Sequence, residues 1–173
     1  MRGKISSRSI AICGLIAAVY TALCLATPIL SYSVVQVRVA EALTLLPVLS
    51  PIGIWGVTLG CAVSNLVGWL SGANPIGFLD TIFGTSATLI AAIITYRLRH
   101  VRYRGLPVLS ALAPVVVNAV VIGAQLSILV TGGLSPLAML INGASVAAGQ
   151  LIACVILGLP LVMALEKKGI VPR

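Results

Sequence analysis

The chain is organised around residues 36–47, which read QVRVAEALTLLP and place Arg38 and Glu41 three residues apart in almost wholly apolar sequence. Only two other residues are acidic, Asp80 and Glu166. A charge at membrane depth costs about 2.5–3.5 kcal/mol on insertion scales, so each buried charge needs compensation. We therefore expect Arg38 to orient Glu41 within a polar ligand pocket. A structural ion pair between the two is the alternative, and both interpretations can hold together.

The composition is typical of an integral membrane protein. The 173 residues are 60% hydrophobic and 8% charged, with a mean hydropathy of +1.17, whereas soluble proteins carry about 25% charged residues. The long apolar runs lack the alternating polarity of a membrane β-barrel. An all-α integral membrane fold follows, formed as a single membrane domain over residues 1–173.

The apolar runs predict a bundle of six transmembrane helices, at about residues 10–30, 40–50, 53–70, 79–96, 107–130 and 137–165. The second is short, so we expect it to be tilted or buried by its neighbours. Lys and Arg gather before residue 10, at 97–104 and at the C-terminus. The positive-inside rule puts all three clusters, and hence both termini, in the cytoplasm. This requires even numbers of crossings and favours six helices over five, the count if 40–70 were one span.

The charge and motif content narrows the possible functions. The net charge of +8 comes from these three clusters, which are expected to set topology and contact anionic lipid, so nucleic acid is not an expected partner. No CxxC occurs and His100 is the only histidine, so we expect no metal site and no cofactor. The sequence lacks HExxH and a phosphate-binding loop, which argues against an intramembrane enzyme and a self-powered pump.

The remaining polar side chains converge toward the outer side of the predicted bundle. At about 1.5 Å per helical residue, three charged residues lie at the outer edge and three amides in the outer half, namely Arg38, Glu41, Asp80, Asn65, Gln125 and Asn142. This predicts a pocket open to the outside and closed toward the cytoplasm, with Gln150 near the middle. For Asp80 the alternative is a favourable place at a helix N-terminus, and for the amides it is helix–helix hydrogen bonding.

Aromatic and small residues add two further predictions. Tyr32 and Trp69 lie near the level of the predicted pocket, where they either form an interfacial belt or stack on a flat ligand. The first helix carries small residues spaced four apart, Gly14, Ala18, Ala22 and Ala26. Such a ridge allows close approach of another helix, either within this bundle or from a partner membrane subunit.

Three segments resemble the queuosine precursor transporter (QueT) family: VRVAEALTLLP at 37–47, GCAVSNLVGW at 60–69 and LDTIFGTSATLIAA at 79–92. The resemblance extends over most of residues 10–165. It implies a substrate-binding S component of an energy-coupling factor (ECF) transporter in a prokaryotic plasma membrane. It also implies a partner transmembrane T subunit, which the small-residue ridge would contact, and two cytoplasmic ATPase subunits.

The resemblance also implies a ligand, a 7-deazaguanine such as queuine or its aminomethyl or cyano precursors. The family's motif positions fall on Arg38, Glu41, Asn65 and Asp80. A carboxylate of Glu41 or Asp80 suits the paired donors of a guanine-like edge, and the amides of Asn65, Gln125 or Asn142 suit the rest. The alternatives are an S component for another flat vitamin-like ligand, a stand-alone secondary transporter and a purely structural membrane subunit.

Overall fold

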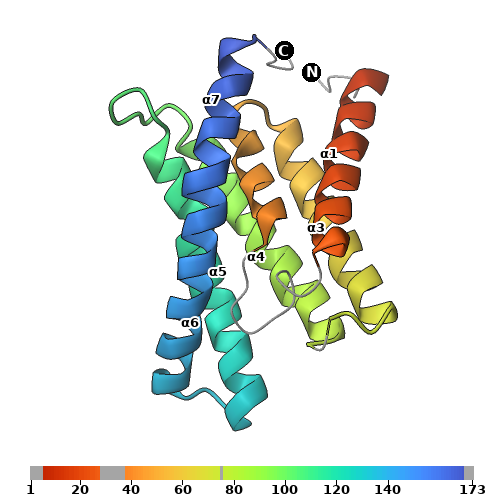
Figure 1. The fold of residues 1–173 in the computed structure, drawn as a ribbon, viewed down its shortest axis with the longest axis vertical. Coiled ribbons are helices and arrows are strands. Elements are labelled where there is room, and N and C mark those ends of the chain that lie inside the picture. The colour runs from red at the N-terminus through yellow and green to blue at the C-terminus, as the bar shows by residue number, and fades with distance from the viewer. Residues whose placement is uncertain (1–5, 28–37, 75, 170–173) are drawn as a thin grey trace, which may run out of the picture.

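The computed structural model describes residues 6–27, 38–74 and 76–169, and this part of the chain is a helical bundle (Figure 1). Its α-helices, in chain order, are α1 Ser7–Ala26, α3 Ile52–Leu70, α4 Phe78–Arg97, α5 Val108–Thr131, α6 Pro136–Gln150 and α7 Leu159–Lys167. A 3₁₀ helix, η1 Val39–Val48, lies between α1 and α3, and a π-helix, η2 Leu151–Gly158, joins α6 to α7.

The predicted all-helical membrane fold is confirmed in these described ranges. Five segments are long and apolar enough to span a membrane: α1, α3, α4, α5 and the continuous 32-residue run Pro136–Lys167. The predicted second helix is present as η1, but it has only ten residues, fewer than the roughly 20 that a span requires. Six crossings and cytoplasmic termini therefore stay predictions.

The short helix η1 occupies the centre of the bundle. Its 3₁₀ geometry rises about 2.0 Å per residue instead of 1.5 Å, which lengthens it to about 20 Å. It contacts α1, α3, α4, α5, η2 and α7, and its burial includes the charged side chain of Glu41. The expectation that neighbouring helices bury this segment is confirmed.

Glycines of α3 bring α1 close to it. A Cβ on Gly60 would lie 2.7 Å from the Cβ of Tyr20, and one on Gly56 would lie 2.7 Å from the Cβ of Ile16. Both distances are too short for real carbon atoms, so these positions admit only hydrogen. The face of α1 toward α3 is thus the one that carries Tyr20, and the ridge at Gly14, Ala18 and the following alanines faces away from it.

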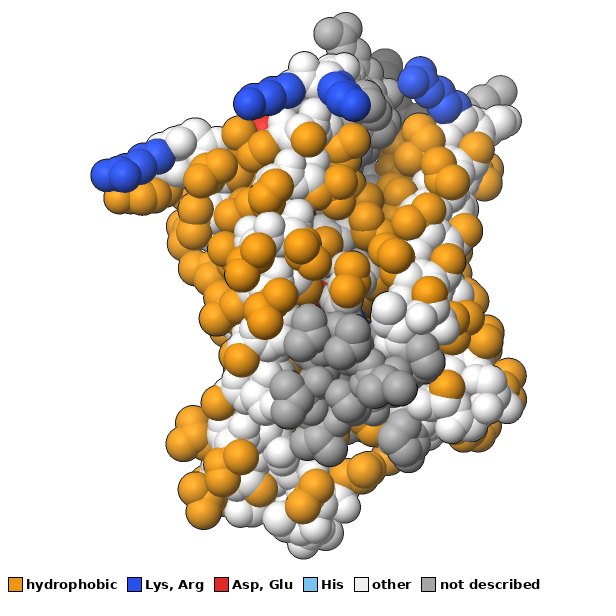
Figure 2. All heavy atoms as spheres, in the orientation of Figure 1, with side chains coloured by type: hydrophobic (Ala, Val, Ile, Leu, Met, Phe, Trp, Pro, Cys, Tyr) orange, Lys and Arg blue, Asp and Glu red, His pale blue; other side chains and the backbone are white. Residues whose placement is uncertain are grey.

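The basic clusters lie together at one end of the bundle, which we call the basic end. It holds the start of α1, the 97–104 segment and the end of α7 (Figure 2). Arg102 and Glu166 join the last two through contacts of 2.6 and 3.1 Å. This is the arrangement on which the positive-inside argument for the topology depends.

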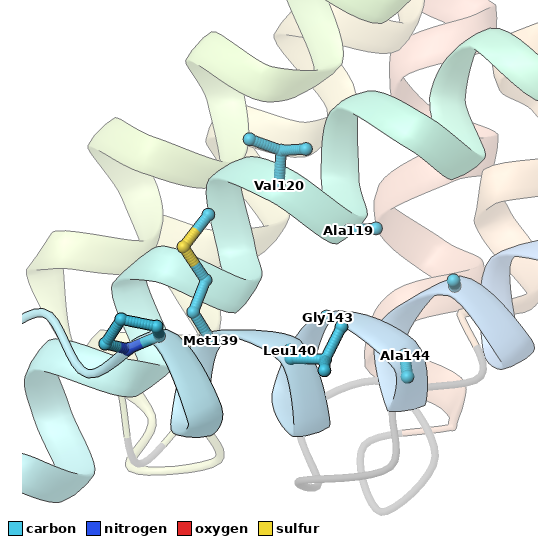
Figure 3. Close-up of a pocket in the computed structure, with 8 residues that line it drawn as sticks. Ala119, Val120, Met139, Leu140, Gly143 and Ala144 are labelled. Carbon is cyan, nitrogen blue, oxygen red and sulfur yellow. The ribbon is translucent and has the colours of Figure 1, made fainter.

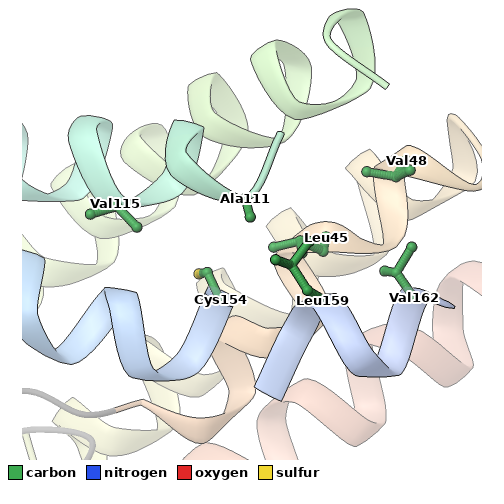
Figure 4. Close-up of a cluster of buried hydrophobic side chains, with 7 residues drawn as sticks. All are labelled: Leu45, Val48, Ala111, Val115, Cys154, Leu159 and Val162. Atoms are coloured by element: carbon green, nitrogen blue, oxygen red, sulfur yellow. The ribbon is translucent and has the colours of Figure 1, made fainter. Parts of the chain in front are cut away.

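An apolar cluster closes the bundle between the basic end and its middle. It joins Leu45 and Val48 of η1 to α5, η2 and α7 through Ala111, Val115, Cys154, Leu159 and Val162 (Figure 4). We call these seven side chains the floor. They lie in the half of the bundle nearer the basic end, the side toward which the predicted pocket is closed.

Gly60→Ala is expected to destabilise the protein, because the added methyl group would overlap Tyr20. Overpacking of a core typically costs about 1–3 kcal/mol. Gly14→Ala is the matched control, since a Cβ there meets no atom within 4 Å. Thermal unfolding in detergent should show a lower Tm for Gly60→Ala alone. An equal Tm for both variants would contradict the close α1–α3 contact.

Candidate ligand site

The buried cation of the site, Arg38, pairs with Asp80. Arg38 Nη2 lies 2.8 Å from Asp80 Oδ2, and the two side chains are 6% and 1% exposed. The same carboxylate oxygen accepts a hydrogen bond of 2.9 Å from Asn74 Nδ2. Arg38 is the N-cap of η1 and Asp80 lies in the first turn of α4, so this ion pair joins two elements that are distant in the sequence. Its partner differs from the sequence expectation, which placed Glu41 beside Arg38.

The carboxylate of Glu41 is held from another direction. Tyr20 Oη of α1 donates a hydrogen bond of 2.5 Å to Glu41 Oε1. The other oxygen, Oε2, is buried and has no hydrogen-bond partner among the described residues. The backbone carbonyl of Glu41 accepts from Thr44 Oγ1 at 2.6 Å and from Cys154 Sγ at 3.5 Å. The glutamate is therefore held in place while its Oε2 stays without a hydrogen-bond partner in the described part of the chain.

Asn65 connects α3 to the Asp80 end of the site. Its Nδ2 donates to the backbone carbonyl of Asp80 at 3.0 Å, and its Oδ1 is buried without a partner. A Cβ on Gly84 would lie 2.8 Å from that Nδ2, so the glycine allows the amide to lie against α4. Asn65 and Asp80, which the sequence analysis assigned separately to the pocket, are therefore in direct contact.

The amide side chains of Asn118, Gln125 and Asn142, on α5 and α6, make no hydrogen bond to the three charged residues or to Asn65 within the described ranges. Both side-chain polar atoms of Gln125 are buried without a partner, as is Nδ2 of Asn118, while Asn142 is only half-buried. Thr81, Thr85 and Ser145 also have buried hydroxyls without partners. Buried polar atoms are normally satisfied, so this concentration on the inner faces of α4, α5 and α6 indicates polar interior space.

The two predicted aromatic residues have different outcomes. Trp69 is 42% exposed, and its ring centroid lies 5.4 Å from that of Phe78, itself 49% exposed. Such exposure on an apolar bundle is typical of an interfacial belt, although stacking on a ligand stays a prediction. Tyr32 lies outside the described residues.

Sequence reasoning missed two residues of the site, Tyr20 and Asn74. Tyr20 is the only tyrosine of α1, and it lies two residues from Ala18 and from Ala22 of the small-residue ridge, hence on the opposite face. Asn74 belongs to a turn, and in the sequence an asparagine at such a position indicates a turn rather than a ligand site. A search for polar side chains capable of reaching the two buried acids could have found both.

The charges of the site leave an excess of acceptors. Its acidic and basic side chains among the described buried residues are Arg38, Glu41 and Asp80, which gives two carboxyl groups to one guanidinium. Arg38 and Asn74 occupy Asp80 Oδ2, so the available acceptors are Glu41 Oε2 and Asn65 Oδ1. The described ranges hold no group of three metal-ligating side chains. The arrangement is suited to a ligand that presents hydrogen-bond donors.

A second concavity, a groove of about 450 Å³, lies between α5 and α6 (Figure 3). It is lined by apolar side chains, of which Val120 and Leu140 are largely exposed. It includes none of the predicted site residues. Its chemistry suits hydrocarbon and offers nothing to a polar ligand.

Comparison with known families gives one match. The model of the family described as QueT transporter matches residues 10–167. Neither the curated proteins nor the solved structures give a match to the chain. The matched range covers almost all the described helices.

Asp80→Asn is expected to destabilise the protein strongly, because it removes the carboxylate that lies 2.8 Å from the buried guanidinium of Arg38. Removing one partner of a buried pair typically costs about 3–5 kcal/mol. Glu166→Gln is the matched control, since its pair with Arg102 is partly exposed and such pairs contribute about 0–1 kcal/mol. Tm in detergent would fall clearly for Asp80→Asn only. Similar small changes in both would contradict a structural role for the Arg38–Asp80 pair.

Proposed function

Because the chain belongs to the QueT transporter family, a family of membrane transporters, we propose that it captures a queuosine precursor from outside the cell as the S component of an ECF importer. It is a multi-pass protein of a prokaryotic cell membrane, and its role is transport rather than catalysis. The proposed ligand is a 7-deazaguanine, such as queuine or its aminomethyl or cyano precursors. A T subunit and two cytoplasmic ATPases would supply the energy.

The observation that carries the ligand proposal is the buried, unpartnered oxygen Oε2 of Glu41. A buried acceptor without a partner costs about 1–3 kcal/mol, more if charged, and a bound donor removes that cost. A guanine-like edge offers N1–H and a 2-amino group as adjacent donors. The Arg38–Asp80 pair favours Glu41 over Asp80 for this role, since Asp80 is already engaged.

The exposed face of α1 supports a partner subunit. Ala18, Ala22 and Ala26 are exposed, as is Gly14, whose Cβ position is free of contacts. Packing within the described bundle does not use this ridge, because α3 contacts the face of α1 that carries Tyr20. An unoccupied ridge of small residues allows a helix of another subunit to approach closely in lipid, where close packing drives association.

Two other functions make different predictions. An S component for another flat vitamin-like molecule would bind riboflavin or a similar ring system instead of deazaguanines. A stand-alone secondary transporter would move its substrate without ATPase partners, and such proteins typically show inverted repeats with broken helices. Ligand binding and partner dependence, measured separately, distinguish these alternatives.

Glu41→Gln is expected to weaken deazaguanine binding by about 10- to 150-fold, the range for a hydrogen bond to a charged group. The measurement is equilibrium titration of the purified protein with queuine, its 7-aminomethyl and 7-cyano precursors, guanine and riboflavin. Glu166→Gln, the same change at the basic end, is the control and should leave Kd unchanged. A folded wild-type protein that binds no deazaguanine would overturn the ligand proposal.

Ala22→Leu is expected to reduce co-purification with the T subunit, because the larger side chain fills the ridge. Leu15→Phe, an enlargement at another exposed position of α1, is the control. Both variants should keep the wild-type Kd for the ligand, since neither side chain faces the interior. Normal assembly of Ala22→Leu would count against docking on this ridge.

A further inference from the structure

The floor provides a common reference level for three helices that run in different directions. Leu45 of η1, Val115 of α5 and Cys154 of η2 belong to this one apolar cluster (Figure 4). Chain direction at the floor is toward the basic end in η1 and η2, and away from it in α5, as the element order and the packing of these segments require. We call the side of the floor that faces away from the basic end 'above the floor', and the residues on that side can be assigned on each helix.

A polar residue occurs one turn above the floor on every one of these helices. Glu41 precedes Leu45 by four residues, Gln150 precedes Cys154 by four, and Asn118 follows Val115 by three. Spacings of three and four keep Asn118 and Gln150 on the same helical face as their floor residues, about 5 Å away along the helix. Glu41 belongs to a 3₁₀ helix and is placed instead by its backbone carbonyl, which lies 3.5 Å from Cys154 Sγ. The three side chains form a polar layer on the floor, of which the sequence analysis had not indicated Asn118.

Contacts within this layer tie it together and leave two atoms open. Cys154 Sγ donates to the backbone carbonyl of Glu41 at 3.5 Å and lies 3.4 Å from Gln150 Oε1. Asn118 is 4% exposed, and its Nδ2 has no hydrogen-bond partner, like Oε2 of Glu41. The layer therefore presents one unpartnered donor and one unpartnered acceptor to the interior above the floor.

We propose that Asn118 is a specificity-determining residue that donates its Nδ2–H to the 6-oxo group of the deazaguanine while Glu41 accepts from N1–H and the 2-amino group. This inference rests on the proposed function. The acceptor–donor–donor order of a guanine-like edge matches a layer that offers an amide donor beside a carboxylate. A ligand that fills only the Glu41 side would leave the Asn118 amide buried and unpartnered, which disfavours it.

The test combines a change in the residue with a change in the ligand. Kd is measured for a 7-deazaguanine and for its 6-thio analogue, which keeps N1–H and the 2-amino group but has a weaker acceptor at position 6. Wild-type protein should prefer the oxo ligand by about 2- to 10-fold, the range for one neutral hydrogen bond. Asn118→Leu, which is close to isosteric, should abolish this preference.

Two controls separate recognition from structure. Val116→Leu, at an exposed position of the same helix, should keep both the wild-type Kd and the oxo preference. Glu41→Gln should weaken the binding of both ligands and keep the oxo preference. The Tm of ligand-free Asn118→Leu should not fall, because the change removes an unpartnered buried donor; Asn118→Ala provides a second variant at the position. An oxo preference that persists in the Asn118 variants overturns this inference alone. Failure of wild-type protein to bind any deazaguanine overturns the proposed function itself.

Discussion

The Arg38–Asp80 ion pair determines what the rest of the site can do. Charges in a membrane bundle must be neutralised or bound, and this pair neutralises the one buried guanidinium of the described ranges with a carboxylate from a distant helix. Glu41 has the hydroxyl of Tyr20 as its closest side-chain hydrogen-bond partner. Tyr20 holds one of its oxygens and leaves the other open. The preference for a donor-rich ligand follows from this division of roles.

Glu41 is positioned by the contact between two helices that are not α-helices, η1 and η2. The 3₁₀ helix η1 lies in the centre of the bundle, and the π-helix η2 packs against it. A Cβ on Gly158 would lie 3.1 Å from the carbonyl oxygen of Ala42, which shows how closely they approach. Short π segments are frequent at functional sites, and this one brings Cys154 to the backbone of Glu41. The apolar floor, to which both helices contribute side chains, lies between Glu41 and the basic end.

Sequence alone predicted the features that depend on local pattern. Apolar run lengths predicted the five segments that are long enough to span a membrane. The short second helix predicted at about residues 40–50 is present as η1, and the quoted motifs indicated the QueT family. Features that depend on tertiary contact could not be predicted from the sequence. Proximity in the sequence suggested Glu41 as the ion-pair partner of Arg38, whereas the folded chain brings Asp80 to Arg38. Residues 151–158 are mostly apolar, so nothing in them signals a π-helix. Tyr20 was missed because a tyrosine in an apolar helix usually indicates an interface.

A structure of the protein with a bound 7-deazaguanine tests the central claim most directly. We expect a ligand N–H donor within about 2.7–3.2 Å of Glu41 Oε2, the range for N–H···O hydrogen bonds, with the Arg38–Asp80 pair unchanged. A ligand bound against Asp80 with that pair broken, or one bound elsewhere while Oε2 stays without a partner, would contradict it.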